Sequence, residues 1–226
     1  MHKDTIKNSI REDASEEFDI LFPERFIKNT DYYNSLMMMY RCAIREVSTK
    51  LEVLDDEFSV KYKRNPISSI KSRIKTPLSI YNKLQRLGYE FTEQNIREQL
   101  NDVAGIRVIC SFVDDIYAVA RLLADQDDIT IIRIKDYIQN PKPNGYRSYH
   151  MIIEIPVFFA EGKTPIRAEI QIRTIGMDFW ASLEHQLRYK KDKVITSEMH
   201  ARLKKCADIM ADADYQMQKL AEEIHF

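Results

Sequence analysis

The stretch Thr164–Thr174 (TPIRAEIQIRT) constrains the fold most, because its side chains alternate strictly in polarity. One set of alternate positions is apolar: Ile166, Ala168, Ile170 and Ile172. The other set is charged or carries an amide: Arg167, Glu169, Gln171 and Arg173. Successive side chains of a strand point to opposite faces, so we predict a strand with one face in the core. Its polar face is either a solvated sheet surface or the floor of a site for a polar, anionic ligand.

The net charge of −1 gives the chain no overall attraction to nucleic acid or membrane, so an anion site requires local clustering of basic residues. Three widely spaced cysteines, Cys42, Cys110 and Cys206, argue against a disulfide framework and a zinc site. The first 19 residues lack an apolar run of signal length, and no stretch of 18 residues is continuously apolar. We therefore expect a cytoplasmic protein that is neither exported nor inserted into a membrane.

One segment has strongly unbalanced charge. Between Glu57 and Glu90 there is no acidic residue, whereas eight residues are basic: Lys61, Lys63, Arg64, Lys71, Arg73, Lys75, Lys83 and Arg86. Lys71, Arg73 and Lys75 alternate with Ile70, Ser72 and Ile74, so a short strand over 70–75 would carry three cations on one face. Thr76-Pro77 and Gly88 delimit a helix over 77–87, as N-cap, first helical residue and C-terminal glycine.

On this helix Ser79, Lys83 and Arg86 share a face, opposite an apolar face of Ile80, Leu84 and Leu87. The cationic strand therefore leads into a helix N-terminus, which is itself a partial positive charge. Two interpretations stay open: a basic surface strip for RNA, or a cradle for a polyphosphate.

Periodicity predicts further elements along the chain. Helices are expected at about 30–57, 93–101, 114–125 and 175–189, and strands at 104–110, 129–134 and 148–155. The last of these strands is expected to pair with 166–174 through a turn at Gly162. In the helix after Thr174 we expect a buried stripe of Phe179, Trp180, Leu183 and Leu187.

The helix over 197–225 has apolar residues at alternating steps of four and three: Met199, Leu203, Cys206, Met210, Ala213, Met217, Leu220 and Ile224. This seam is typical of a coiled coil, so it predicts a partner helix, in this chain or in another copy.

The chain lacks a Walker loop and a GxGxxG motif, and five glycines leave little room for a backbone phosphate nest, so Lys and Arg side chains must hold any phosphates. Asp102 and Glu169 stand near predicted strand ends, which suits Mg²⁺ bound by one or two carboxylates together with substrate phosphates. Tyr146 leaves a turn-rich loop, 140–146, and is a candidate to stack on a base. The residues alone indicate magnesium-dependent phosphoryl or nucleotidyl chemistry.

Six blocks, in order and at similar spacing, resemble the synthetase domain of the RelA/SpoT family over about residues 60 to 190. They are Ser72–Ile80, Asp102–Arg107, Lys135–Ile138, Lys142–His150, Glu169–Thr174 and Met177–His185. The length of the chain makes it similar to small alarmone synthetases of the RelP/RelQ type. The resemblance implies a GTP pyrophosphokinase that moves pyrophosphate from ATP to the 3′-hydroxyl of GTP or GDP, releases AMP and makes pppGpp or ppGpp in stringent-response signalling.

The resemblance also assigns roles to residues. Arg73 and Arg107 would sandwich the adenine of ATP. The ATP phosphates would contact Lys75, Ser79, Lys83 and Arg86. Asp102 would bind Mg²⁺, and Glu169 would share that ion or take the proton of the 3′-hydroxyl. Tyr146 would stack on guanine, and the acceptor nucleotide would also be lined by Lys135, Lys142, Asn144, His150, Gln171 and Asp178. Asp178 stands where related enzymes often have Asn.

By the same resemblance the expected fold is α+β: a mixed, mainly antiparallel sheet flanked by helices, similar to nucleotidyltransferases, with long helices at both ends. We expect an N-terminal lead-in and helix over 1–58, the synthetase domain over 59–192, and a C-terminal helix over 193–226 for oligomerisation, typically into a homotetramer. Two other functions stay open: a non-catalytic RNA-binding module using the strip over 61–86, and a nucleotidyltransferase that transfers AMP.

Overall fold

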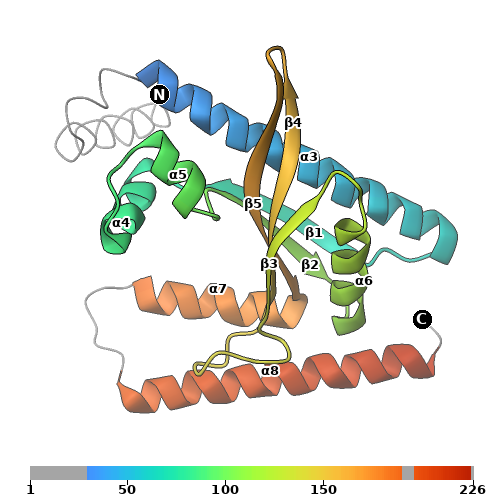
Figure 1. The fold of residues 1–226 in the computed structure, drawn as a ribbon. Helices are drawn as coiled ribbons and strands as arrows, with labels where there is room; N and C mark the ends of the chain where they lie inside the picture. Colours follow the sequence, from blue (N-terminus) through green and yellow to red (C-terminus); the bar gives the residue numbers. More distant parts are fainter. Residues whose placement is uncertain (1–29, 190–195, 225–226) are drawn as a thin grey trace, which may run out of the picture.

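A computed structural model describes residues 30–189 and 196–224 of the chain (Figure 1). The elements are α3 (Thr30–Tyr62), β1 (Ile67–Ile74), α4 (Pro77–Leu87), α5 (Glu93–Gln99), β2 (Ala104–Cys110), α6 (Val113–Ala124), β3 (Thr130–Asp136), β4 (Tyr149–Phe159), β5 (Gly162–Thr174), α7 (Ile175–Tyr189) and α8 (Ser197–Glu223). The expected N-terminal lead-in over 1–28 and the boundary at residue 192 lie outside these ranges. No helix in the described part of the chain is long and apolar enough to span a bilayer.

The five strands form one sheet in the order β1-β2-β5-β4-β3. β2 and β5 run parallel, whereas the three other neighbouring pairs are antiparallel. Helices flank this sheet, and long helices stand near both ends of the chain (Figure 1). The predicted fold class, a mixed and mainly antiparallel sheet with flanking helices, is confirmed.

Strand register gives the sheet two different faces. In the parallel pair, Ile106 lies opposite Ile170 and Val108 opposite Ile172, and all four are buried in the core. Helix α3 packs against β1, β2, β4 and β5 on this side. The alternate positions bring polar side chains into adjacent rows on the opposite face: Lys71 and Arg73 of β1, Arg107 of β2, Glu169, Gln171 and Arg173 of β5, and His150 of β4. The predicted two-faced strand over 164–174 is confirmed.

Capping residues and polarity patterns in the sequence predicted the bounds of several elements to within a few residues. Helix α4 has Thr76 as its N-cap, whose hydroxyl accepts a hydrogen bond from the Ser79 N–H, and Gly88 closes it with a φ of 81°. Strand β2 has the predicted bounds. β4 and β5 pair as predicted, with Phe159 opposite Gly162, and β4 runs four residues past the predicted end at 155. α3 and β3 also extend beyond their predicted ends, to Tyr62 and Asp136.

Two predicted apolar stripes are partly wrong. On α7, Trp180 is buried, but Phe179, Leu183 and Leu187 are 57%, 42% and 54% exposed. The buried face is instead made by Met177, Trp180 and Ala181, because this is the side of α7 that packs against β5 and α8. On α4, Ile80 and Leu84 are buried as predicted, whereas Leu87 is exposed in the last turn.

Helix α8 lies beside α7 (Figure 1) and also contacts α6. Its buried residues are Ala207 and Ala221, which are not in the predicted seam. Leu203 and Met210 of the seam are partly buried against Trp180, whereas the remaining seam positions are exposed: Met199, Cys206, Ala213, Met217, Leu220 and Ile224. Within the described chain, the seam therefore finds the predicted partner helix, α7, along only part of its length.

Candidate active site

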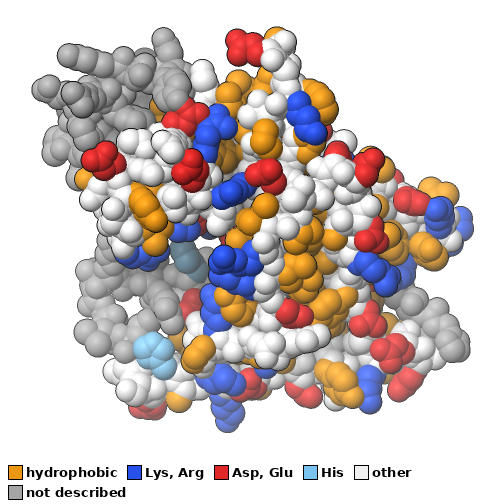
Figure 2. Space-filling view, viewed as in Figure 1, with side chains coloured by type: hydrophobic (Ala, Val, Ile, Leu, Met, Phe, Trp, Pro, Cys, Tyr) orange, Lys and Arg blue, Asp and Glu red, His pale blue; other side chains and the backbone are white. Residues whose placement is uncertain are grey.

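A cavity opens on the polar face of the sheet, where β1, β2 and β5 lie side by side. It is lined by Lys71, Ser72, Arg73, Asp102, Gly105, Ile106, Arg107, Glu169 and Gln171. Five residues predicted for the site are in this set: Arg73, Asp102, Arg107, Glu169 and Gln171. Figure 2 shows basic side chains gathered around a hollow on one side of the molecule, between α4 and α8.

Asp102 lies between two lysines from the basic segment. The chain enters β2 just after Asp102, and Lys75 stands directly after β1, which pairs with β2. Lys75 Nζ donates to Asp102 Oδ2 at 3.0 Å, and Lys83 Nζ of α4 lies 2.8 Å from Oδ1. Burial alone raises the pKa of Asp102, but the hydrogen bonds and charges of Lys83 and Lys75 outweigh it, so the pKa is lowered. Asp102 is therefore ionised at neutral pH.

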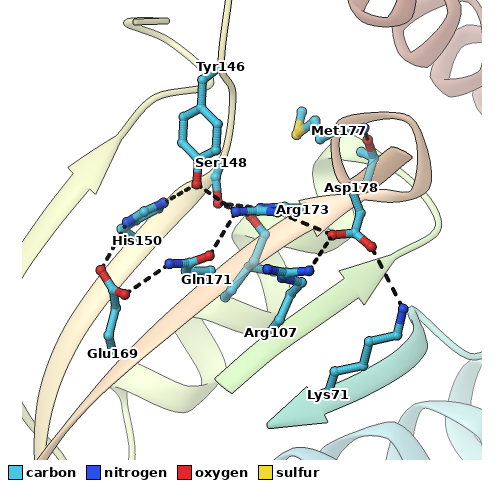
Figure 3. Close-up of polar contacts among 12 residues, drawn as sticks. Lys71, Arg107, Tyr146, Ser148, His150, Glu169, Gln171, Arg173, Met177 and Asp178 are labelled. Atoms are coloured by element: carbon cyan, nitrogen blue, oxygen red, sulfur yellow. Dashed lines mark hydrogen bonds and ion pairs between the residues drawn. The ribbon is translucent and has the colours of Figure 1, made fainter. Parts of the chain in front are cut away.

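Glu169 belongs to a closed ring of polar side chains (Figure 3). Its Oε1 lies 3.3 Å from His150 Nδ1, and His150 Nε2 lies 2.7 Å from the Tyr146 hydroxyl. Arg173 donates to that hydroxyl at 2.7 Å and to Gln171 Oε1 at 2.8 Å. Gln171 closes the ring by donating to Glu169 Oε2 at 2.9 Å. The ring joins β4 and β5 to the loop that precedes β4.

The ring also sets the charge of Glu169. Burial raises the pKa of its carboxyl, and the hydrogen bond and charge of His150 together with the Gln171 amide lower it. Asp102 adds a smaller effect in the raising direction. The net result is a lowered pKa, so Glu169 is also ionised at neutral pH.

Asp178, in the first turn of α7, forms ion pairs with three basic side chains. Its Oδ1 lies 3.2 Å from Arg107 and 3.2 Å from Arg173, and its Oδ2 lies 3.9 Å from Lys71. Burial lowers the pKa of Arg107, and the neighbouring charge of Arg173 adds to this effect. The carboxylate therefore holds two guanidinium groups together that would otherwise repel each other (Figure 3).

The loop between β3 and β4 supplies aromatic and basic groups. Tyr146 packs edge-on against Tyr137 and His150, with ring centroids 5.9 Å and 5.8 Å away. Lys142 Nζ lies 4.6 Å from the Tyr137 centroid and 4.7 Å from that of Tyr146. Asn144 shapes the loop, because its Oδ1 accepts from the Tyr146 N–H at 3.2 Å.

The remaining predicted residues lie around this centre. Lys135 of β3 pairs in register with His150 and is exposed. Ser79 and Arg86 lie on the exposed side of α4, outside the set of described residues that line the cavity. Of the polar side of that helix, Lys83 is the residue that contacts Asp102.

Arg173, Lys71 and Tyr137 were not predicted to be site residues, although each contacts one of the predicted site residues. Arg173 had a usable signal, because strand alternation placed it on the same face as Glu169 and Gln171. Lys71 had the same signal relative to Arg73. For Tyr137 the available signal was its place in the block Lys135–Ile138, whereas its contacts depend on the path of a loop.

Within the described ranges, no three His, Cys, Asp or Glu side chains are grouped as a metal site. The cavity instead has two ionised carboxylates, Asp102 and Glu169, among cations. Magnesium is commonly bound by one or two carboxylates plus substrate phosphates, so this oxygen donor set fits it. Fold and site together define a class: proteins with a mixed sheet, one face of which carries clustered cations around two ionised carboxylates.

Comparison with known proteins specifies the family. Residues 72–194 match the region found in RelA / SpoT proteins. Over 194 residues the chain is 44% identical to the GTP pyrophosphokinase YwaC of Bacillus subtilis, covering 86% of this chain and 92% of that protein. The chain thus belongs to the RelA/SpoT family, as the six sequence blocks predicted.

Two solved structures extend this similarity to three dimensions. The small alarmone synthetase 1 of Bacillus subtilis bound to its product pppGpp superposes with a TM-score of 0.79 at 32% identity, covering 86% of this chain and 99% of that one. The same synthetase bound to AMPCPP gives a TM-score of 0.73 at 30% identity, covering 86% and 98%.

Proposed function

We propose that this protein is a (p)ppGpp synthetase, which transfers the pyrophosphoryl group of ATP to the 3′-hydroxyl of GTP or GDP and releases AMP. One observation carries the proposal: ionised Asp102 and Glu169 line a single cavity, and Glu169 is connected through His150 to Tyr146. Family membership supports it, as do the related synthetases described with pppGpp and AMPCPP. In this proposal the ATP phosphates bind in the cavity near Asp102, and the base of the second nucleotide binds at Tyr146, which is connected to the cavity through His150 and Glu169.

The donor half of the site comprises Arg73, Lys75, Lys83, Asp102 and Arg107. Arg73 lies across Gly105, where a β-carbon would stand 3.5 Å from its Cγ, and Arg107 is the next side chain of β2 on that face. We assign adenine binding to these two planar guanidinium groups. Lys75 and Lys83 contact the ATP phosphates in this proposal, with Ser79 and Arg86 further along α4, and stabilise charge that develops in the transition state.

The acceptor half comprises the loop 140–147, which includes Lys142, Asn144 and Tyr146, together with Lys135, His150 and Gln171. Tyr146 is the residue we assign to stacking on guanine, since every base offers a flat face to an aromatic ring. Lys135 and Lys142 supply positive charge for the acceptor phosphates. Asp178 is engaged by Arg107 and Arg173, so its contribution is to hold these groups in place, and a direct guanine contact stays a prediction.

Glu169 is the residue we assign to deprotonation of the 3′-hydroxyl. Its lowered pKa keeps it ionised, and His150 and Gln171 fix the two carboxylate oxygens. Asp102 and Glu169 are the ligands we assign to Mg²⁺. The ion would supply charge neutralisation on the transferred phosphates. Lys75 and Lys83 orient the Asp102 carboxylate for this task.

We also propose that the protein works in the cytoplasm as a homo-oligomer, typically a tetramer. The three cysteines are free, as expected for a reducing compartment. The exposed apolar positions of α8, Met217 among them at 55% exposure, support self-association. Light scattering on the wild type and on Met217→Glu tests this: we expect a larger assembly that the charge disrupts, and an unchanged monomer would contradict it.

The activity test is direct. The pure protein is incubated with ATP, Mg²⁺ and either GTP or GDP, and the nucleotides are separated. We expect AMP together with pppGpp or ppGpp, and a loss of about 10²–10⁴-fold in Glu169→Gln, with the circular dichroism spectrum and binding of a non-hydrolysable ATP analogue retained.

The other outcomes identify the alternatives. Release of pyrophosphate instead of AMP would identify an AMP transferase. Absence of product, with steeply salt-dependent RNA binding unaffected by Glu169→Gln, would identify a non-catalytic RNA-binding module.

A further inference from the structure

The inner face of α8 contacts the loop that carries Tyr146. Gly145, immediately before Tyr146, is buried and has a φ of +89°. A β-carbon at this glycine would stand 2.5 Å from the Ala207 β-carbon and 3.6 Å from the Lys204 Cα. The loop backbone therefore rests directly on α8 at the smallest side chain of that turn, and a larger residue at 145 or 207 would separate the two.

Arg147, on the other side of Tyr146, fastens the same contact. Its Nη1 donates to the Ala207 carbonyl at 3.2 Å and to the Gly145 carbonyl at 3.4 Å. Its Nη2 lies 3.5 Å from Asp208, which is also held by Lys204 at 2.6 Å. Both backbone neighbours of Tyr146 are thus attached to one turn of α8.

A second contact from α8 reaches the start of α7. Thr174 ends β5, and its hydroxyl accepts from the Met177 N–H at 3.1 Å, which caps the helix. The same hydroxyl donates to Asp214 Oδ2 of α8 at 2.6 Å. A β-carbon at Gly176 would stand 3.0 Å from Asp214 Oδ1, so the carboxylate lies close against the first turn of α7. Asp178, which holds Arg107 and Arg173, belongs to that turn.

Ala207 and Asp214 are not among the described residues that line the cavity. They touch Gly145 and Thr174, and through these they act on Tyr146 and Asp178 respectively. Most of the donor half has a different origin, because Lys75, Lys83 and Asp102 contact one another from the end of β1, from α4 and from the start of β2. A shift of α8 at Ala207 would therefore displace the acceptor side, whereas a shift at Asp214 would reach Arg107 of the donor half as well as Arg173, because Asp178 contacts both.

We propose that α8 is a positioning element of the acceptor half, in which Ala207 sets the position of Tyr146 and Asp214 sets the first turn of α7. The proposal rests on the proposed function for the meaning of the acceptor half. The expected consequence is selective at Ala207: loosening this contact weakens use of the guanosine nucleotide and leaves use of ATP nearly unchanged. Loosening the Asp214 contact is expected to weaken use of both nucleotides, because Asp178 holds Arg107 as well as Arg173. A displacement of about 1 Å at such a site costs up to about 10²-fold.

The test uses two variants of the full-length chain with matched controls on the same helix. Ala207→Leu inserts bulk under Gly145, and Asp214→Asn weakens the bond to Thr174. Ala201→Leu and Asp212→Asn make the same chemical changes at exposed positions. We expect the KM for GTP or GDP to rise by roughly 10–10²-fold in the first pair and both controls to behave like the wild type. The KM for ATP should stay within about twofold in Ala207→Leu and should also rise in Asp214→Asn. Asp214→Glu is expected to recover part of the loss.

Amide hydrogen exchange separates this inference from the proposed function. Residues 140–147 should exchange faster in Ala207→Leu than in Ala201→Leu, whether or not the protein makes alarmone. Equal exchange in these two variants, or equal changes in the KM of both substrates in Ala207→Leu, would overturn the positioning role. A wild-type protein without synthetase activity would refute the proposed function, while faster exchange would still support the contact. If Ala207→Leu does not fold, the KM for GTP or GDP decides: equal values for Asp214→Asn and Asp212→Asn would overturn the positioning role.

Discussion

The two halves of the cleft are held in place by different physics. In the donor half, cations and carboxylates on neighbouring strands and on α4 pair directly, as Lys75 and Lys83 do with Asp102. In the acceptor half, the loop 140–147 is held by close packing on α8, a helix about sixty residues further along the chain. The difference teaches that paired charges can be supplied by neighbouring strands and the adjacent helix α4. An aromatic ring on a loop instead has to be positioned by a helix from a distant part of the chain.

The largest expected effect comes from removing the support of the acceptor half. Trp180 is 5% exposed and donates its indole N–H to the Leu203 carbonyl at 2.9 Å, so it fastens α7 to α8. We expect Trp180→Ala to destabilise the protein by about 3–5 kcal/mol, measured by urea unfolding, with α8 exchanging early. Phe179→Ala is the matched control: Phe179 is 57% exposed, and its loss should cost within about 0.5 kcal/mol. Equal costs would mean that α8 is not anchored there.

The next effect concerns charge in the donor half. Lys83→Met removes one of the two cations on Asp102, and we expect kcat to fall by about 10²–10³-fold with little change in unfolding. Lys61 is a suitable comparison, because it belongs to the same basic segment but pairs with Glu57 on α3. Lys61→Met should retain full activity in a nucleotide assay. Similar losses in both variants would favour a diffuse basic surface over a defined site.

A pair of substitutions at Tyr146 distinguishes its ring from its hydroxyl. Tyr146→Ala removes the stacking surface, and we expect the KM for the guanosine nucleotide to rise by roughly 5–150-fold, equivalent to about 1–3 kcal/mol. Tyr146→Phe keeps the ring but removes the contacts to Arg173 and His150, both at 2.7 Å. It should affect kcat more than KM, because Glu169 loses part of its support. Steady-state kinetics with each substrate varied in turn measure both effects. If the ring does not stack on guanine, the KM for the guanosine nucleotide would be similar in Tyr146→Ala and Tyr146→Phe.

The smallest expected effect is an opposite pH dependence of two aspartates. The lysines keep the pKa of Asp102 below its ordinary value of 3.8 despite burial, so its stabilising contribution is present above pH 3.8 and disappears as the pH falls through the lowered pKa. Burial raises the pKa of Asp214 above 3.8, partly offset by the Thr174 hydrogen bond and by Arg147. Its contribution is present below pH 3.8 and disappears as the pH rises through the raised pKa.

Urea unfolding of the wild type, Asp102→Asn and Asp214→Asn across the acid range checks both signs. Relative to the wild type, Asp102→Asn should recover stability as the pH falls below 3.8, and Asp214→Asn should gain stability as the pH rises above 3.8. Parallel curves for the two variants would show that the aspartates have similar environments, contrary to the structure.

Much of the fold was predictable because its signals are local. Pro77 and Gly88 delimit α4 through backbone preferences that need no tertiary contact, and strict alternation identifies β5 and its two faces. The parallel pairing of β2 with β5 was not predicted. Some sixty residues separate the two strands, and the sequence of a strand does not indicate which strand lies beside it in the sheet. This pairing is nevertheless what places Arg107 beside Gln171 and Gly105 beside Glu169.

The basic run that supplies Lys75 and Lys83 was conspicuous in the sequence, and these lysines do contact Asp102, whereas their assignment to a donor half stays a prediction. The contacts of α8 were not predicted. Its strongest apolar pattern is the seam containing Met217 and Leu220, but the face that packs within the chain includes Ala207 and Asp214. A small side chain such as Ala207 and a carboxylate such as Asp214 add little to a hydrophobic pattern. Close packing of two backbones nevertheless requires small side chains between them.

The pairing of Asp102 with two lysines has a consequence for ligand discrimination. An anion that takes over Lys75 and Lys83 leaves this carboxylate without its counterions, and a partly buried charge without a partner is costly. Free orthophosphate or a metal-free nucleotide incurs that penalty in full. On the proposed function, a polyphosphate chelated to a divalent cation would bring a replacement charge with it, so we expect the cleft to favour chelated nucleotides over the simpler anions that are abundant in a cell.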